Sequence, residues 1–439
     1  MPFASLGLEA SILKAVADQG YTDPTPIQKA TIPVILEGTD VIGIAQTGTG
    51  KTAAFTLPIL TRLVTSKSST HKAKVRCLIL APTRELVVQI AENVAAYSRY
   101  SGATVATCYG GVSERPQIAA LRKGCDFLIA TPGRLLDLGS QGHGDFSGVE
   151  CLVLDEADRM LDMGFLPAIN TIVRALPKER QTLMFSATLS REIETLTKQF
   201  QKSPKLIEVG RRSNPAETVT QLLYECPSSL KQVMLNQLLK DEENFKMVLV
   251  FARTKHGADR VCRKLEAEKI HCAAIHANRS QAQRQRALQA FKNGEIRVLV
   301  ATDIASRGID VDGITHVVNF DFPDQLEDYV HRIGRTGRAQ AKGTAITFIT
   351  RENQGDLRRL EKIIGKHLHC GKLKDFDYSQ QAPARQSDDF VRERDPRAGA
   401  HNSERSGRPQ GGRHGGFRAA QGKYRPFGRP GTRRTGGPK

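Results

Sequence analysis

Short apolar runs alternate with amphipathic segments along most of the chain. Such runs occupy residues 40–44, 75–81, 104–109, 126–130, 149–154 and 181–185 in the first half, and 247–252, 271–275, 297–301, 315–320 and 344–349 in the second. Apolar runs of strand length, separated by stretches long enough for a helix, are typical of parallel β-sheets with helices on both faces. The pattern therefore predicts an α/β protein.

One polar stretch divides this alternation into two halves. Residues 210–218, GRRSNPAET, contain Gly and Pro and predict an exposed linker. We therefore expect a first domain at 39–209, which a leading segment at 1–38 completes, and a second domain at 219–378. Ligands of open parallel sheets lie beyond the carboxyl ends of the strands, so we expect chemically active side chains at those ends.

The last 61 residues, 379–439, lack the apolar runs of the rest of the chain. They contain 11 Gly and 6 Pro, and Val391 is the only residue among Ile, Leu, Val and Met. So little apolar area cannot offset the entropy of ordering, which predicts a disordered tail. The tail has 14 Lys and Arg against 5 Asp and Glu, so it supplies 14 − 5 = 9 of the chain's 18 net positive charges.

Composition narrows the choice of partner. A net charge of +18 and a pI near 9.7 indicate a polyanionic partner, nucleic acid first and an acidic membrane surface second. In the tail, arginines are interspersed with the rings of Phe390, Phe417, Tyr424 and Phe427. Positive charge with stacking rings favours a single-stranded RNA contact, and a solubilising or degradation-prone tail is the alternative.

Cysteine usage and hydropathy indicate the cellular compartment and whether a membrane is involved. The eight cysteines are scattered without a Cys-x-x-Cys pair, and no secretory signal is evident, which predicts a reduced, cytoplasmic protein. No run approaches the roughly 18 apolar residues of a membrane span, so we expect no membrane partner. The group His367, His369 and Cys370 has no second half-site, so we expect no metal other than Mg²⁺.

The stretch AQTGTGKT, which follows the first apolar run, has the pattern of a phosphate-binding loop. Such a loop needs a strand before it, a Gly-rich turn and a helix after it, so that backbone N–H groups converge on phosphate oxygens. Lys51 would reach the β- and γ-phosphates, and the Thr52 hydroxyl would bind Mg²⁺. The loop comprises Ala45, Gln46, Thr47, Gly48, Thr49, Gly50, Lys51 and Thr52. Ala45 stands where the general pattern has Gly, and a Gly-rich structural turn is the alternative.

Carboxylates follow another apolar run of the first half. Residues 149–154, VECLVL, lead directly into Asp155, Glu156, Ala157 and Asp158. In a phosphate-loop NTPase this is the place of the second Mg²⁺ contact, so Asp155 would help to hold the ion. Glu156 would orient and activate the attacking water. A solvated acidic helix start is the alternative.

These motifs and others, in this order, resemble the DEAD-box RNA helicases over residues 3 to 375. The first half carries Phe3, GYTDPTPIQ (20–28), AQTGTGKT, PTREL (82–86), Gly110-Gly111, TPGR (131–134), DEAD (155–158) and SAT (186–188). The second carries VFARTK (250–255), Gln281-x-x-Arg284, ATDIASRGID (301–310) and HRIGRTGR (331–338). Ala45 is usual in this family. The sequence as a whole looks closest to the bacterial RhlE-like branch.

The resemblance implies two tandem RecA-like domains and ATP as the nucleotide. Phe3 would stack on adenine, and the Gln28 amide would match its N6 and N7 edge. Asp310 would contact the ribose, while Arg335 and Arg338 would act as arginine fingers from the second domain. The carboxylate-containing motif would be coupled to the interdomain contacts by Ser186, Thr188, Asp158 and His331.

The resemblance also divides sequence-independent RNA contacts between the two halves. They are Thr83, Arg84, Gly111, Thr131, Gly133 and Arg134 in the first, and Arg253, Arg279, Gln281, Arg284 and Thr302 in the second. We expect an ATP-dependent RNA helicase that locally unwinds short duplexes, with ribosomal precursor particles or RNA-decay enzymes as possible partners. The alternatives are an RNA chaperone or clamp dominated by the tail, and a DNA helicase on the same fold.

Overall fold

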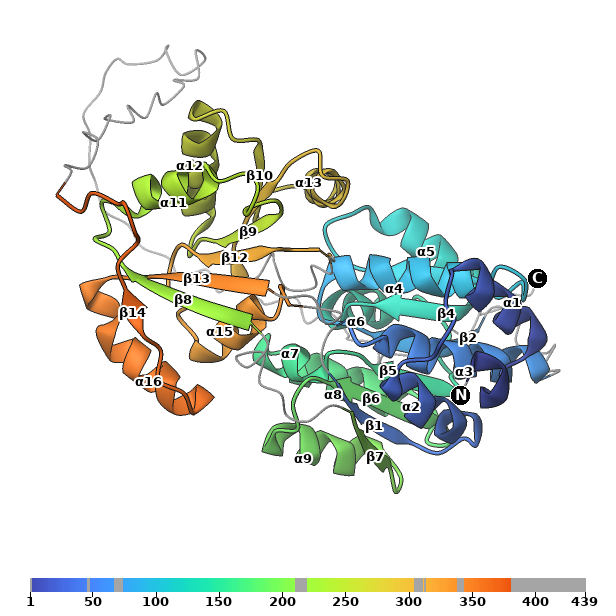
Figure 1. Ribbon diagram of the computed structural model, residues 1–439. Helices are drawn as coiled ribbons and strands as arrows, with labels where there is room; N and C mark the ends of the chain where they lie inside the picture. The colour runs from blue at the N-terminus through green and yellow to red at the C-terminus, as the bar shows by residue number, and fades with distance from the viewer. Residues whose placement is uncertain are drawn as a thin grey trace, which may run out of the picture. The chain divides into compact units, whose positions relative to one another are not determined.

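The computed structural model contains two seven-stranded sheets whose strands are all parallel (Figure 1). It describes residues 2–45, 48–66, 74–209, 219–303, 311, 313–337 and 343–379. The predicted linker at 210–218 and nearly all of the predicted tail lie outside the described residues, so both stay predictions.

The first sheet has the order β3-β4-β2-β5-β6-β1-β7. Its strands are β1 (Val41–Ile44), β2 (Val75–Leu80), β3 (Val105–Cys108), β4 (Cys125–Ala130), β5 (Cys151–Leu154), β6 (Gln181–Ser186) and β7 (Lys205–Glu208). Because β5, β6 and β1 are neighbours and parallel, their carboxyl ends meet at one edge. That edge receives the phosphate loop after β1, the carboxylates after β5 and the SAT residues at the end of β6.

Helices cover both faces of this sheet because successive strand residues point to opposite sides. Cys77 and Ile79 of β2 belong to one core, and Leu78 and Leu80 to another. The first core is closed by η1 (Phe3–Leu6), α1 (Ala10–Asp18), α2 (Pro26–Leu36), α3 (Lys51–Thr65) and α4 (Arg84–Tyr97). The second is closed by α5 (Glu114–Lys123), α6 (Pro132–Ser140), α7 (Ala157–Asp162), α8 (Leu166–Ala175) and α9 (Arg191–Phe200).

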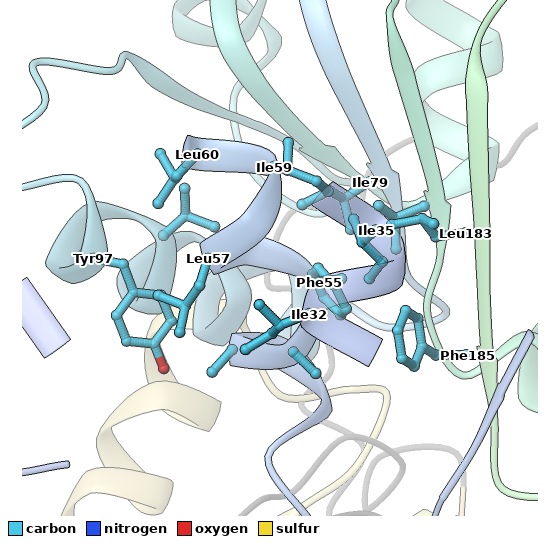
Figure 2. Packing of buried hydrophobic residues seen from close by; sticks show 14 of the residues in the cluster. Ile32, Ile35, Phe55, Leu57, Ile59, Leu60, Ile79, Tyr97, Leu183 and Phe185 are labelled. Carbon is cyan, nitrogen blue, oxygen red and sulfur yellow. The ribbon is translucent and has the colours of Figure 1, made fainter. Parts of the chain in front are cut away.

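The first core fixes the helix that begins at the phosphate loop. Figure 2 shows Phe55 of α3 beside Phe185 of β6, with Ile32 and Ile35 of α2 close by. The two rings are tilted, with their centroids 5.3 Å apart, and both residues are fully buried. Removing one such ring typically costs about 3–5 kcal/mol of folding free energy, so α3 has little freedom to shift.

The second sheet has the order β10-β11-β9-β12-β13-β8-β14. Its strands are β8 (Val219–Glu225), β9 (Val248–Phe251), β10 (Cys272–Ile275), β11 (Val298–Ala301), β12 (His316–Asn319), β13 (Gly343–Ile349) and β14 (Cys370–Gly371). One core contains residues of α13 (Gln281–Lys292), α15 (Leu326–Ile333) and α16 (Gln354–Ile364), which follows η2 (Arg351–Asn353). Helix α12 (Lys255–Ala267) packs on β10 and β11, and also contacts α11 (Lys231–Leu239).

Each apolar run that predicted the sheets contains a strand, which confirms the predicted α/β class with parallel sheets. Three strands were not anticipated: β7, β8 and β14. Two of them, β7 and β14, lie at sheet edges, and β7 buries only Ile207. Strand β8 alternates buried and exposed residues rather than forming a continuous apolar run. Their signal was therefore weaker than that of the central strands.

The described residues include all eight cysteines, and every one is a free thiol. No helix in the described ranges combines the length and the apolar character needed to cross a bilayer.

Candidate nucleotide and RNA site

The phosphate loop turns sharply from β1 into α3. Gly50 is the residue before α3 and has a φ of +88°, a conformation that side chains disfavour. Lys51 is buried, and its Nζ donates to the carbonyl oxygen of Ala45 at 2.9 Å. The ammonium group is thus held across the mouth of the loop. Of the predicted loop residues, Gln46 and Thr47 lie outside the described part of the chain.

Gln28 connects the leading segment to this loop. Its Oε1 accepts from the Thr25 backbone N–H at 2.8 Å, completing a capping box at the start of α2. Its Nε2 donates to the Gly50 carbonyl oxygen at 3.1 Å, and a Cβ on Gly50 would overlap that nitrogen. Phe3 is buried against the first core rather than exposed. Sequence reasoning anticipated the importance of Gln28 but not its contact with the loop.

Burial and neighbouring cations shift the pKa values of the two acidic residues after β5 in opposite directions. Burial raises the pKa of Asp155 to about 7, although Lys51 opposes the shift. Burial also favours the neutral form of Glu156, but Arg159 and then Lys51 outweigh it, and the pKa of Glu156 lies below its usual range. Arg159 Nη1 lies 2.7 Å from Glu156 Oε2, and both side chains are buried. Glu156 is therefore held as a carboxylate.

Glu156 also has an uncommon backbone conformation. Its φ is +51°, in the left-handed region, where a residue with a Cβ is strained by roughly 1–2 kcal/mol. It directly precedes α7, so this turn sends the chain from the end of β5 into the helix. Strain of this kind persists where the surroundings over-determine it, and it is often found at functional sites.

Asp158 links the acidic motif to the end of β6. Its Oδ2 accepts from the backbone N–H of Ala187 at 3.0 Å and from that of Thr188 at 3.1 Å. The Thr188 hydroxyl donates to the same oxygen at 3.3 Å, and Ser186 Oγ accepts from the Thr188 N–H at 3.3 Å. The structure thus brings together three of the four residues expected to couple the motifs.

A cavity of about 490 Å³ joins these elements. It is lined by residues of the leading segment, the phosphate loop, α4 and the acidic motif, and by Arg335. The predicted residues on its wall are Phe3, Gln28, Gly48, Gly50, Lys51, Thr52, Asp155, Glu156 and Arg335. Tyr21, Gln89, Asn93 and Tyr97 also line it and were not predicted. The cavity has the size of a small-molecule site, with three acidic side chains, Asp23, Asp155 and Glu156, and two cations, Lys51 and Arg335.

The structure describes the basic motif HRIGRTGR (331–338) of the second domain as far as Gly337. Arg335 is buried, and its Nε donates to the carbonyl oxygen of His331 at 3.3 Å. Burial lowers the pKa of His331, and Arg159 lowers it further. Arg338 and Asp310 lie outside the described residues, so their predicted contacts with phosphate and ribose stay predictions.

Among the predicted RNA contacts of the first domain, Arg84 and Gly111 lie together. Gly111 has a φ of +81°, and a Cβ there would overlap the Arg84 guanidinium. Thr83 caps α4, because its Oγ1 accepts from the Leu86 N–H at 3.3 Å. At the start of α6, Thr131 and Gly133 flank Pro132, and Arg134 Nη2 lies 3.6 Å from Glu114 Oε1. These residues follow β2, β3 and β4, at the same edge as the nucleotide site.

The predicted RNA contacts of the second domain follow β9, β10 and β11. Arg253 Nε pairs with Asp324 at 3.1 Å, and Arg279 Nη2 pairs with Asp259 at 2.8 Å. Thr302 directly follows β11. Gln281 Nε2 donates to Glu85 Oε1 at 3.2 Å, and Arg284 Nη2 lies 2.9 Å from the same oxygen. The predicted contacts Gln281 and Arg284 therefore share a carboxylate in this structure.

The buried charged residues that the sequence did not assign include Glu85, Arg159 and Arg332. All three lie inside or beside a quoted motif, so the sequence marked their neighbourhood without assigning them. For Arg332 a signal was present, since it lies three residues after Tyr329 and next to Ile333 in α15, both fully buried. Helical spacing therefore directs Arg332 inward.

Comparisons with known proteins decide the family. The family model described as DEAD/DEAH box helicase matches residues 25–196, and that described as helicase conserved C-terminal domain matches residues 230–340. The ATP-dependent RNA helicase RhlB of Pseudomonas aeruginosa is 44% identical over 373 residues, which cover 84% of this chain and 94% of RhlB. The chain belongs to the DEAD-box ATP-dependent RNA helicases.

Two further relatives extend this DEAD-box comparison. CshA of Listeria monocytogenes is 43% identical over 366 residues, which cover 83% of this chain and 69% of CshA. DEAD-box ATP-dependent RNA helicase 30 of Arabidopsis thaliana is 45% identical over 363 residues, but the match spans only 61% of its length. The placement in an RhlE-like branch is not decided by these relatives and stays a prediction.

Solved DEAD-box structures share the fold. Yeast Dbp5 bound to RNA and ADP BeF3 has a TM-score of 0.74 and 29% identity, over 85% of this chain and 95% of Dbp5. Mss116p bound to single-stranded RNA and AMP-PNP has the same TM-score and identity, over 85% of this chain and 79% of Mss116p. The two parallel sheets are thus the two RecA-like domains expected from the motifs, and the helicase is an RNA-stimulated ATPase.

Proposed function

We propose that this DEAD-box helicase separates short RNA duplexes locally, or remodels RNA–protein complexes, by ATP hydrolysis coupled to domain closure. The observation that carries the proposal is Asp158, which belongs to the acidic motif and binds the SAT residues through three hydrogen bonds. A change at the bound phosphate can therefore reach the end of β6 through one side chain.

Within the nucleotide site, we assign Lys51 to the β- and γ-phosphates and Glu156 to the attacking water. Glu156 is suited to accept a proton because Arg159 and Lys51 keep it ionised in a buried position. Arg335, on the wall of the same cavity, would stabilise the charge of the transition state. An arginine finger of this kind is worth roughly 10³–10⁵ in rate.

Mg²⁺ fits the residues that the sequence assigned to it. Asp155 is a buried carboxyl group whose pKa is raised to about 7, and Thr52 supplies a hydroxyl on the same cavity wall. Mg²⁺ prefers such oxygen ligands and binds through one or two of them plus phosphates. When bound, the ion would neutralise charge on the β- and γ-phosphates.

RNA would be held without sequence preference by residues at the carboxyl edges of both sheets. Arg84 beside Gly111, Arg253 and Arg279 supply charge for phosphates. RNA and ATP would favour closure because they contact both domains in one state only. The closed state would accept a bent single strand and exclude a duplex, so unwinding would be local.

A second candidate is an RNA chaperone or clamp, favoured by the tail, which carries 9 of the 18 net positive charges. For either function, we propose the cytoplasm as the compartment, and ribosomal precursor particles or RNA-decay enzymes as partners. The helicase relatives RhlB and CshA support the first candidate over the second.

The test measures ATP hydrolysis and duplex separation by the full chain with RNA, with DNA of the same sequence, and without nucleic acid. We expect RNA to stimulate hydrolysis strongly and DNA to have little effect. Equal stimulation by DNA would indicate a DNA helicase. Strand annealing without ATP-dependent unwinding would favour the chaperone or clamp.

A further inference from the structure

Arg332 is the largest of the fully buried side chains in the described part of the chain, with 2% of its surface exposed. Its guanidinium binds Asp303 in a bidentate pair along one edge, with Nε 2.6 Å from Oδ1 and Nη2 2.6 Å from Oδ2. Its Nη1 donates to Asn319 Oδ1 at 3.2 Å and to the Asp321 carbonyl oxygen at 2.7 Å. The group also lies over the Phe251 ring, 4.9 Å from its centroid.

These partners come from the ends of three adjacent strands, because the sheet order is β11-β9-β12. Asp303 follows β11 and is the neighbour of Thr302, a predicted RNA contact. The carboxylate of Asp321, beyond β12, accepts from the backbone N–H of Arg253 at 3.0 Å. Arg253, which follows β9, is another predicted RNA contact. One guanidinium therefore joins the segments that carry two RNA-contact residues.

The same residue supports the turn that carries the predicted arginine finger. Arg332 lies in the last turn of α15, and the backbone N–H of Arg335 donates to the Arg332 carbonyl oxygen at 3.1 Å. A displacement of Arg332 therefore moves the backbone of Arg335. Conversely, a displacement of Asp303 or Asp321 pulls directly on Arg332.

We propose that Arg332 is a positioning residue, which couples the RNA contacts Thr302 and Arg253 to the placement of Arg335. The proposal rests on the proposed function, since it needs RNA at one end of the network and ATP at the other. Arginine is required because its planar fork binds both carboxylate oxygens of Asp303 at once, which a lysine ammonium cannot reproduce.

The test replaces Arg332 by Lys, which keeps the charge and loses the fork. We compare kcat with and without saturating RNA, the KM for ATP and the melting temperature. We expect the RNA-stimulated kcat to fall by about tenfold to a hundredfold, as a displacement of about 1 Å can cause. The unstimulated rate and the KM for ATP should change little.

Two further variants separate coupling from stability. Arg76→Lys is the matched control, because Arg76 is also buried and pairs with Glu150 at 2.8 Å. It lies at the amino-terminal end of β2, away from the carboxyl ends that carry the nucleotide site and the predicted RNA contacts. The substitution should lower the melting temperature and leave RNA stimulation intact. Asp303→Asn disturbs the same network from the RNA side and should reproduce the Arg332→Lys result, which keeps the test decisive if that variant does not fold.

The outcomes are distinct. Equal loss of the unstimulated and RNA-stimulated rates in Arg332→Lys or Asp303→Asn would show that the network is structural only, and unchanged stimulation would also overturn the proposal. A wild-type protein that RNA does not stimulate would instead contradict the proposed function itself.

Discussion

Asp158 and Thr188 form the direct link between the acidic motif and the end of β6. One carboxylate oxygen, Asp158 Oδ2, lies 3.1 Å from the Thr188 backbone nitrogen and 3.3 Å from its hydroxyl. The Thr188 side chain is otherwise exposed, so its hydroxyl can also be offered to another partner. Asp158 itself is buried, and its role is to hold this short segment in place.

Replacing Thr188 by Ala should weaken unwinding more than ATP hydrolysis. The substitution removes one long hydrogen bond and leaves both backbone bonds to Asp158, so the cost in folding free energy should stay near 1 kcal/mol. Asp155 and Glu156 keep their positions, so hydrolysis should persist. The measurement is unwinding per ATP hydrolysed. Thr195→Ala is the control, since that hydroxyl bonds only to a carbonyl within α9. Equal loss of both activities would contradict a coupling role.

Replacing Lys51 by Ala should abolish ATP turnover while the protein stays folded. The lost ammonium group donates to the Ala45 carbonyl oxygen, and its charge partly opposes the rise that burial causes in the pKa of Asp155. Turnover should fall by orders of magnitude, because Lys51 would contact the transferred phosphate. Lys123→Ala, an exposed lysine on α5, should retain full activity. Persistent turnover in the Lys51 variant would remove the phosphate-loop assignment.

The strands and the nucleotide motifs were predictable because their signals are local. A continuous apolar run marks a buried parallel strand, and a Gly-Lys-Thr turn after such a run marks a phosphate site. The residues that connect motifs were not predictable in this way. Arg332 binds Asp303, 29 positions earlier in the chain, and Glu85 meets Gln281 across 196 positions. Such pairs depend on which strands become neighbours, and no local pattern specifies that.

The role of Gln28 shows a further limit of sequence reasoning. Its amide matches an adenine edge in principle, yet the structure uses both ends of that amide, for the Thr25 N–H and the Gly50 carbonyl. An amide oxygen has two lone pairs and the NH₂ group two hydrogens, so one of each stays available in principle for a base. Local chemistry identified the residue, and only the fold revealed that it also braces the loop.

Replacing Gly111 by Ala should weaken RNA binding by displacing Arg84. At φ +81° an added Cβ is strained by roughly 1–2 kcal/mol, and it would also overlap the Arg84 guanidinium. Gly142→Ala is the matched control, because Gly142 has a φ of +84° and no atom lies within 4 Å of an added Cβ. Both variants should lose similar stability, and only the first should lose RNA affinity. Equal RNA affinity in the two variants would contradict a role for Arg84 beside Gly111.

The ion pair of Lys231 and Asp321 should make the folding free energy depend on pH in the acidic range. Burial works to raise the pKa of Asp321, but Lys231, 2.8 Å away, outweighs it, so this pKa lies below its usual range. The pair's contribution is therefore present above the pKa of an unfolded Asp, about 3.9, and is lost as the pH falls through the lower folded value. Lys231→Met should cost about 3 kcal/mol at pH 7, and the difference from the wild type should shrink in acid.

The measurement is urea unfolding of both proteins between pH 3 and pH 7, about the range over which carboxylates titrate. Lys202→Met is the control, because the pair of Lys202 and Glu179 is exposed and should contribute nothing measurable. A difference for Lys231→Met that does not change with pH would show that packing of the lysine stem, rather than the ion pair, supplies the stability.

The basic tail should set RNA affinity through charge rather than through the order of its residues. Each phosphate neutralised on a single strand contributes a slope of about −0.7 to the logarithm of affinity against the logarithm of salt. Replacing the 14 Lys and Arg of residues 379–439 by Gln should therefore flatten the salt dependence of RNA binding. A full-length variant with the tail residues in shuffled order should keep the wild-type slope. At saturating RNA, all three proteins should hydrolyse ATP at the same rate if the RecA-like domains contain the whole active site. A loss of hydrolysis in the Gln variant would favour the clamp, in which the tail dominates.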